Sequence, residues 1–264
     1  MIATTASEVS QENVWDVVAH VQESTINSFP LTLASHFGEL MSFIEQDDLV
    51  RQIEAAARKL RGSTTIARIG GCSVFVTLGM SVRWCGVSGS LAQMVQMGIR
   101  REAGDLPIEI HYDIVPGSCI ELRIVLSDGE ANDRALLKML NPSDSIVDWV
   151  VETAPLWDPG VNRLLGLGIG GNPERAMQMA RVALFEPHDI ACIIARGPND
   201  WRERLRVETM KECARVGYAV KDVLIVGAPT HAGTKPVALM CSLPFASRVA
   251  HIVLNGNPRN ASRA

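Results

Sequence analysis

A strand passes into a helix within residues 163–185, which read RLLGLGIGGNPERAMQMARVALF. The largely apolar run predicts a strand over Arg163–Ile169, after which glycines let the backbone turn tightly. Asn172 is a good helix N-cap, Pro173 suits the first helical position, and Glu174 complements the positive end of the helix. The stretch therefore predicts one strand-turn-helix unit, around which the rest of the chain can be placed.

Further strands and helices are expected on both sides of this unit. We expect strands over 72–79, 81–87, 108–115, 119–126, 191–195, 222–226, 236–240 and 250–254, and helices over 7–28, 47–60, 90–101, 144–153, 173–185 and 201–216. The tight turn at Gly79 predicts that the first two strands form a hairpin. The pattern as a whole predicts an α/β fold (mixed α+β), with a helical N-terminus followed by mixed sheets and packed helices. We place the helical segment at 1–62 and one further structural unit at 63–264.

The composition excludes several broad classes of protein. The chain has 264 residues, a formal net charge of −4 and 47% hydrophobic residues, which argues against disorder and against a general nucleic-acid binder. No apolar run approaches the roughly 18 residues of a membrane span, and the first residues lack a secretory signal pattern. Six scattered cysteines without a CxxC pair are typical of reduced core residues, so we expect a cytoplasmic protein.

The glycine turn after the strand is the first candidate binding site. Backbone amides of Gly170, Gly171 and Asn172 at a helix N-terminus can hold a carboxylate or a phosphate. The same letters satisfy GxGxxG, the dinucleotide fingerprint, and Arg196 at the end of the next expected strand would suit the 2′-phosphate of NADP. A tight turn that binds no ligand is the third interpretation, and the local sequence leaves all three open.

A second candidate site is the loop THAGTKP at residues 230–236, which precedes an expected strand. It places an imidazole, an amine and two hydroxyl groups within a few residues of one another. His231 and Lys235 are therefore candidates for acid–base chemistry on a small polar substrate. An exposed histidine that only makes hydrogen bonds is the alternative.

Two further groups of charged residues allow either a functional or a structural interpretation. Glu109, His111 and Asp113 alternate along one strand and so face one way, which fits a divalent cation site or a solvated strand face. Arg100 lies with Arg101 at the end of an expected helix, where it either complements the helix dipole or binds a carboxylate.

Several blocks of sequence, in order along the chain, resemble the class I (iron–sulfur) fumarase and L-tartrate dehydratase family. The blocks are MLNPSDSIVDWVVETAP (139–155), LLGLGIGGNPERAMQMARVALFEP (164–187), RGPNDWRERLRVE (196–208), PTHAGTKPVAL (229–239) and SRVAHIVLNG (247–256). The similarity is to the α subunit, or N-terminal domain, of that family. It implies the fold of that domain and a hydro-lyase activity, in which a [4Fe–4S] cluster held by three cysteines binds the substrate.

The chain departs from the family at each cluster cysteine. It reads ARIGG (67–71) where the family has CQDTG, and WDPGVNR (157–163) where the family has CPP before the glycine turn. Near the third position it reads CSLPFASR (241–248), with Cys241 a few residues early. We therefore expect no [4Fe–4S] cluster and no other metal. A cluster with undetected ligands that include Cys72 and Cys241 is the alternative.

The resemblance and these departures together predict a repurposed lyase that acts on a small carboxylic acid. In this hypothesis His231 and Lys235 move protons and the glycine turn binds an anion. Arg100 or Arg248 holds a carboxylate. A non-catalytic pseudoenzyme that serves as a partner or scaffold subunit is the alternative, and an ordinary iron–sulfur hydro-lyase and an NADP-linked oxidoreductase are minor ones. The family implies a homodimer and allows a β-type swivelling-domain subunit, and neither a nucleic acid nor a membrane is expected as a partner.

Overall fold

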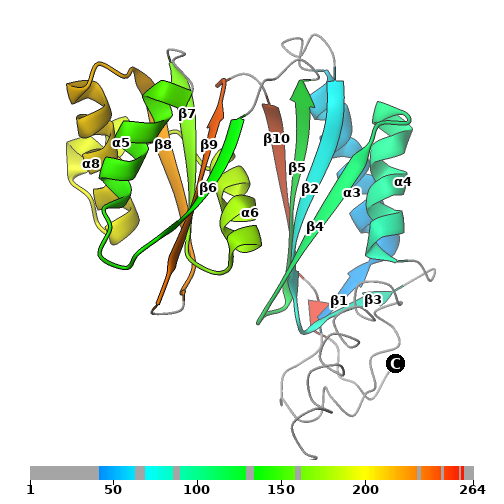
Figure 1. Cartoon of the computed structure of the whole chain (residues 1–264). Coiled ribbons are helices and arrows are strands. Elements are labelled where there is room, and N and C mark those ends of the chain that lie inside the picture. Colours follow the sequence, from blue (N-terminus) through cyan, green and yellow to red (C-terminus); the bar gives the residue numbers. More distant parts are fainter. Residues whose placement is uncertain are drawn as a thin grey trace, which may run out of the picture. The chain divides into compact units, whose positions relative to one another are not determined.

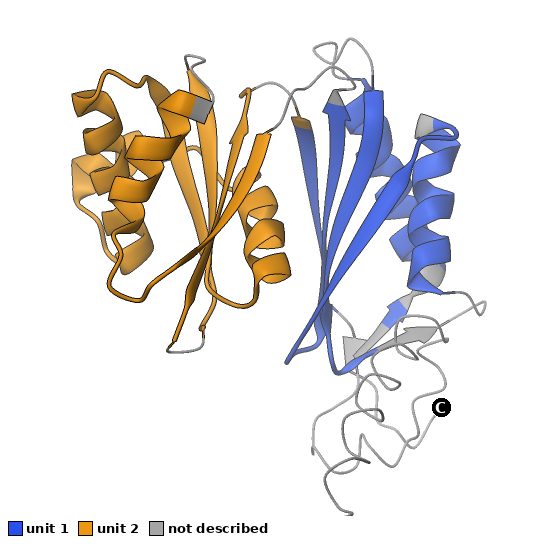
Figure 2. Ribbon diagram, viewed as in Figure 1, with its two compact units in different colours: residues 1–127, 248–264 blue, residues 128–247 orange. Residues whose placement is uncertain are grey.

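The computed structural model describes residues 42–62, 69–85, 90–128, 134–157, 162–230, 233–244, 247–255 and 257–258. The chain forms two compact units (Figure 2): unit 1 comprises residues 1–127 and 248–264, and unit 2 comprises residues 128–247. The helix expected over 7–28 lies outside the described residues. Each unit combines strands and helices, which confirms the expected mixed α+β fold.

Unit 1 is built on a four-stranded sheet with the strand order β10-β5-β2-β4. The strands are β2 (Ile69–Gly79), β4 (Ile108–Val115), β5 (Cys119–Asp128) and β10 (Ser247–Asn255). A smaller sheet joins β11 (Asn257–Pro258), β1 (Ser42–Glu45) and β3 (Val82–Cys85). The helices are α3 (Gln46–Arg61) and α4 (Leu91–Ala103), as expected from the sequence.

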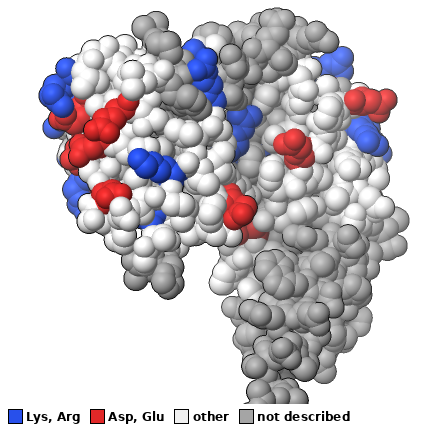
Figure 3. Space-filling view, in the orientation of Figure 1, with Lys and Arg blue, Asp and Glu red and all other residues white. Residues whose placement is uncertain are grey.

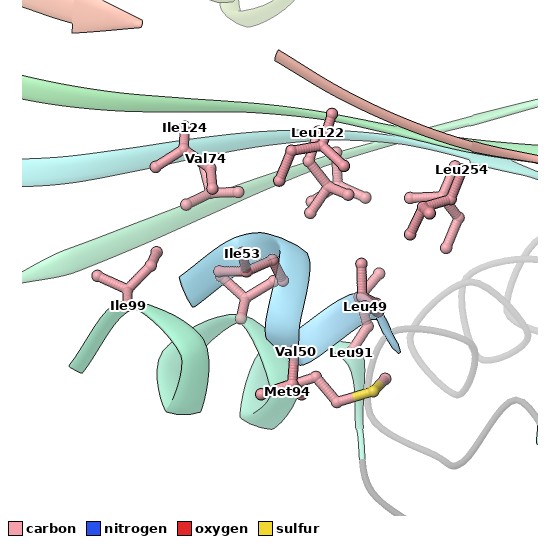
Figure 4. Close-up of a cluster of buried hydrophobic side chains, with 14 of the residues drawn as sticks. Leu49, Val50, Ile53, Val74, Leu91, Met94, Ile99, Leu122, Ile124 and Leu254 are labelled. Atoms are coloured by element: carbon pink, nitrogen blue, oxygen red, sulfur yellow. The ribbon is translucent and has the colours of Figure 1, made fainter. Parts of the chain in front are cut away.

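The core of unit 1 lies between its four-stranded sheet and the two helices. Figure 4 shows Leu49 and Ile53 of α3 and Ile99 of α4 pointing at side chains of the sheet, and all three are fully buried. The helices themselves pack closely, because a Cβ at Gly98 of α4 would lie 2.7 Å from Cγ2 of Ile53. The apolar sides of α3 and α4 therefore pack together against the sheet.

Unit 2 is built on a second four-stranded sheet with the order β6-β9-β7-β8. Its strands are β6 (Arg134–Leu140), β7 (Arg163–Ile169), β8 (Val220–Gly227) and β9 (Lys235–Ser242), and its helices are α5 (Ile146–Trp157), α6 (Pro173–Ala183), α7 (Ile190–Arg196) and α8 (Trp201–Arg215). β7 runs parallel to β8, whereas β9 runs antiparallel to both β7 and β6. Helices α5 and α8 cover one face of the sheet, and α6 covers the other (Figure 1).

The two faces of this sheet are packed differently. The face under α5 and α8 holds the larger core, with leucine, isoleucine and valine side chains of β7, β8 and β9. The face under α6 holds small residues, among them Ala176 and Ala180 of α6 and Ala238 of β9. A Cβ at Gly168 of β7 would lie only 1.9 Å from the carbonyl oxygen of Ala176. The alternating glycines of β7 therefore allow α6 to lie directly on the strand.

Two local predictions are wrong, and three strands were not anticipated: β6, the short β11, and β1, which lies in the segment 1–62 that was expected to be helical. The segment 191–195 lies in the helix α7 and not in a strand, because a short apolar run fits either element and only Ile193 of it is buried. β2 and β3 form no hairpin: the amides of Met80 and Ser81 donate to carbonyl oxygens of Val115 and Gly117, and β3 pairs in parallel with β1. β6 was missed, since its pairing with β9 depends on residues about a hundred positions away.

No helix in the described part of the chain has the length and apolar character needed to cross a membrane. On the face shown in Figure 3, acidic and basic side chains are interspersed over the described residues, and they form no continuous basic surface there. This distribution agrees with the formal net charge of −4.

Candidate functional site

The candidate site lies at the edge of the unit 2 sheet where β7 and β8 end and β9 begins, which is the lower end of this unit in Figure 1. Ile169, the last residue of β7, pairs with Gly227, the last residue of β8. Loops at the carboxyl ends of parallel strands are the usual place for ligands in α/β sheets. Both loops that the sequence singled out start here.

The glycine turn is tied into the neighbouring loop by its own amides. Gly170 and Gly171 have φ values of +90° and +67°, which side chains other than that of glycine rarely permit. The Gly170 amide donates to the carbonyl oxygen of Pro236 at 2.9 Å, and the Gly171 amide donates to that of Pro229 at 3.0 Å. These two amides are therefore engaged within the chain.

Asn172 and Thr230 complete the same turn. Asn172 is the N-cap of α6, as expected, and its side-chain oxygen accepts from the amide of Arg175 at 2.7 Å. The Thr230 hydroxyl lies 3.3 Å from the carbonyl oxygen of Gly171 and 3.2 Å from that of Thr234, so it can donate to one of them at a time. Hydrogen bonds thus join the glycine turn to residues 228–230 and 233–236.

Lys235 links this structure to the loop before α5. Its half-buried side chain donates from Nζ to the carbonyl oxygen of Pro142 at 3.0 Å and to that of Asp144 at 2.5 Å. An ammonium group has three N–H donors, so one of them has no hydrogen-bond partner among the described residues. That donor is available to an oxygen of a ligand.

Three helices begin along this edge, α5 and α8 on one face of the sheet and α6 on the other. α6 begins after the glycine turn, α5 begins after the loop that Lys235 holds, and the Trp201 ring at the start of α8 lies against Gly227. Each N-terminus has a side-chain cap: Ser145 accepts from the amide of Asp148 in α5, Asn172 caps α6, and Asp200 accepts from the amide of Glu203 in α8. Partial positive charge from three helix ends, together with a lysine ammonium, favours an anion at this edge.

Hydrogen bonds lower the pKa values of two carboxyl groups at the start of α8. The backbone amide of Glu203 and the Arg202 side chain both bond the Asp200 carboxylate, which lowers its pKa. Arg196 donates two hydrogen bonds to Glu203, at 2.9 Å and 2.5 Å, and this pairing lowers the pKa of the Glu203 carboxyl. The turn between α7 and α8 is therefore a fixed, ion-paired structure that holds Trp201 in place.

The remaining residues predicted for the site lie elsewhere. His231 lies outside the described residues. Arg100 is an exposed residue in the last turn of α4, and Arg248 is at the start of β10, so both belong to unit 1. The Nε atom of Arg248 is buried and has no hydrogen-bond partner among the described residues.

The described cysteines do not fit the cluster that the resemblance implies. Cys72 belongs to the core of unit 1, whereas Cys213 and Cys241 belong to the core of unit 2. Burial raises the pKa of the Cys72 thiol to about 12 and that of Cys213 to about 11, so both stay protonated at neutral pH. A cubane needs three thiolates that converge on one point. In the described parts of the chain no such set of donors occurs.

Neither the divalent cation site on β4 nor the NADP site gains support from the structure. His111 stacks on Phe75, with ring centroids 4.9 Å apart, and among the described residues no group of three His, Cys, Asp or Glu side chains is placed to hold a metal ion. The NADP interpretation needed a strand that ends at Arg196, and that segment is the helix α7. The glycine pattern is explained by the close approach of α6 to β7.

Two contributors to the site were not predicted from the sequence. The loop at residues 141–145 reaches the site only through Lys235, and no local pattern indicated this contact. Trp201 is the first residue of α8, and its contact with Gly227 joins two segments 26 positions apart. The sequence shows an aspartate, the N-cap Asp200, followed by Trp201, but it does not show that Trp201 contacts Gly227.

A comparison with models of protein families gives a match. The sequence model of a family described as fumarate hydratase (Fumerase) matches residues 87–253, which is more than half of the chain. A search of curated proteins returned no match. The matched range contains the whole of unit 2 and therefore the glycine turn and the Lys235 loop.

Proposed function

This chain belongs to the fumarate hydratase (Fumerase) family, and we propose that it is a lyase that acts on a small carboxylic acid without a [4Fe–4S] cluster. The observation that carries the proposal is that Lys235 and the starts of α5, α6 and α8 lie along the carboxyl edge of β7 and β8. A carboxylate is the anion that the family's chemistry would bring there. The free N–H of Lys235 and the positive helix ends would hold it.

The proposed reaction is the reversible loss of water. A base removes a proton from the carbon beside the carbon that carries the hydroxyl group, the C–O bond breaks, and the hydroxyl leaves as water after it gains a proton. His231 is the candidate for moving these protons, because it is next to Thr230 in the loop that is bonded to the glycine turn. Lys235 then stabilises the negative charge that develops on the acid. The prediction that Arg100 or Arg248 binds a carboxylate stays untested.

The proposal that the cluster is absent rests on the cysteines. Cys72 and Cys241 are each buried in the core of a different unit, and the family's other cysteine positions carry different residues here. Without the cluster's Lewis-acid iron, the protein's own cations must stabilise the negative charge that develops on the acid. In unit 2 this places the catalytic demand on Lys235.

The test combines a metal analysis with an activity screen. Protein purified without oxygen is analysed for iron and sulfide, and is then assayed for water addition and elimination on a panel of small hydroxy and unsaturated acids. We expect less than one iron per chain and a turnover that His231→Ala lowers by at least a hundredfold. His251→Ala is the matched control, because His251 is a half-exposed histidine of β10 in unit 1. About four irons per chain would overturn the cluster-free proposal, and equal turnover in His231→Ala would overturn the role of His231.

One observation favours a second candidate function. The amides of Gly170 and Gly171 and two of the three Lys235 donors are engaged within the chain. A site with few free donors also fits a non-catalytic partner or scaffold subunit that keeps the family fold. In that case the protein binds no acid, and light scattering on a co-purified sample would find a complex with a β-type subunit instead of the homodimer.

A further inference from the structure

The Trp201 ring, and not the backbone conformation of Gly227, explains why position 227 has no side chain. Gly227 has no positive φ, yet a Cβ at this position would lie 2.6 Å from Cη2 and 2.8 Å from Cζ2 of the Trp201 ring. The glycine therefore makes room for the indole, which sits against the end of β8. Even so, 47% of Trp201 remains exposed.

This indole lies beside the candidate anion site. Ala228, the residue after Gly227, donates its amide to the carbonyl oxygen of Ile169 at 2.9 Å, and Pro229 accepts from the amide of Gly171. The chain thus passes from the indole to the glycine turn within two residues. Trp201 is the half-exposed aromatic side chain that α8 presents at this edge.

Lys235 and Trp201 also lie on the same face of the sheet. Val237 of β9 and its partner Ile169 of β7 belong to the core under α5 and α8. Because side chains alternate along a strand, Lys235, two residues before Val237, lies on the same face of the sheet as Val237. Gly227 is two residues from Ile225, which belongs to the same core. β9 and β8 are separated by β7, and Gly227 is level with Val237, two residues beyond Lys235. Two strand spacings and a two-residue offset place the backbones of Lys235 and Gly227 roughly 12 Å apart.

We propose that the exposed indole of Trp201 binds a hydrocarbon segment of the acid whose carboxylate is held at Lys235. The ligand class is then a carboxylic acid with an apolar segment several carbons long, and not a compact dicarboxylate. A two-carbon acid is too short to reach both groups, whereas a six-carbon acid spans more than half of the distance between the two backbones, and the two side chains shorten the rest. This inference rests on the proposed function, because it assumes that the edge binds an acid.

The experiment measures how affinity depends on chain length. Acetate, butyrate and hexanoate are titrated into the full-length protein, and binding is followed by the thermal unfolding midpoint and by tryptophan emission. In the wild type, affinity rises roughly fourfold for each added methylene group that packs on the ring. In Trp201→Ala the affinity rises less than twofold for each added methylene. In Trp201→Phe most of this increase in affinity remains, but the change in tryptophan emission is lost.

Two further variants separate this effect from general damage. Gly227→Ala keeps the indole but places a Cβ where the ring now lies, so it should reduce the chain-length dependence as Trp201→Ala does. Leu156→Ala removes a side chain that is 87% exposed near the other end of α5, and should leave the dependence unchanged.

The outcomes distinguish the two proposals. If the acids bind and Trp201→Ala shows the wild-type dependence on chain length, the role of Trp201 is wrong while the anion site stands. If succinate binds more tightly than hexanoate, the proposed ligand class is wrong. If none of the acids binds to the wild type, the proposed function fails and the inference falls with it.

Discussion

The Lys235 ammonium donates a hydrogen bond of 2.5 Å to the carbonyl oxygen of Asp144, across 91 positions of the sequence. The same Nζ atom donates to the carbonyl oxygen of Pro142. One side chain at the start of β9 therefore fixes the loop that precedes α5. Its position decides both the local stability of this edge and the direction of its remaining donor.

Replacement of Lys235 by methionine should affect stability and binding together. The two carbonyl oxygens lose a charged donor, so we expect the free energy of unfolding to fall by about 1–2 kcal/mol. Acid binding should weaken by tenfold or more, measured by titration calorimetry. Lys138→Met, on an exposed lysine of the neighbouring strand β6, is the control and should change neither quantity. Unchanged acid affinity in Lys235→Met would show that the ammonium does not contact the ligand.

Replacement of Gly168 by alanine tests the contact between β7 and α6. A Cβ would lie 1.9 Å from the carbonyl oxygen of Ala176, and backbone atoms cannot yield as a side chain can. We expect a loss of about 3 kcal/mol or more in urea unfolding. Gly71→Ala is the matched change in unit 1, where the added Cβ would meet one atom, 3.9 Å away. Similar stability of the two variants would contradict the close packing of α6.

Arg206 and Asp222 form a buried ion pair in unit 2. Asp222 is 1% exposed, and Arg206 bonds its Oδ1 atom at 3.1 Å and the carbonyl oxygen of Val223 at 2.7 Å. Arg206→Met leaves a buried carboxylate without its cation, so we expect a loss of about 3 kcal/mol in chemical unfolding. Arg202→Met breaks an exposed pair with Asp200 and should cost less than about 1 kcal/mol. Equal losses would mean that burial does not set the strength of these pairs.

Stability at alkaline pH should depend on Cys72. Burial raises the pKa of its thiol from 9.0 to about 12 in the folded protein, so the unfolded chain ionises first as pH rises. The contribution is therefore present below pH 9 and is lost progressively between pH 9 and 12. Urea unfolding at pH 8 to 11 should show a smaller decline in Cys72→Ala than in the wild type. Cys192→Ala, which removes an exposed thiol, should decline as the wild type does.

Local rules predicted the elements around the glycine turn well. Asn172 and Pro173 each satisfy a known preference at the start of a helix, and the structure has α6 begin where they predict. β7 has the bounds expected from its apolar residues. Here the preferences of single residues and the tertiary packing agree, so the sequence was sufficient.

The predictions that failed depended on distant partners. Residues 191–195 satisfy the composition of a strand, but no neighbouring strand pairs with them, and the segment is the helix α7. β3 follows β2 after a tight turn, yet its hydrogen bonds go to β1. Local sequence does not specify which strand another strand will pair with.

Only part of the candidate site was predicted, because its other contacts join residues that are far apart in the sequence. The sequence identified Gly170, Gly171, Asn172 and Lys235, and the structure brings all four to one edge through hydrogen bonds. It did not reveal that the two glycine amides are already occupied, because their acceptors, Pro229 and Pro236, are about 60 positions away. The site role of His231 stays a prediction.

Unit 1 is assembled from two separate stretches of the chain, with all of unit 2 between β5 and β10. During synthesis on the ribosome, every strand and helix of unit 2 emerges before β10 does. Unit 2 can therefore fold while the sheet of unit 1 still has one unpaired edge at β5. A chain cut before residue 247 would contain every strand of the unit 2 sheet but would lack β10 of the unit 1 sheet.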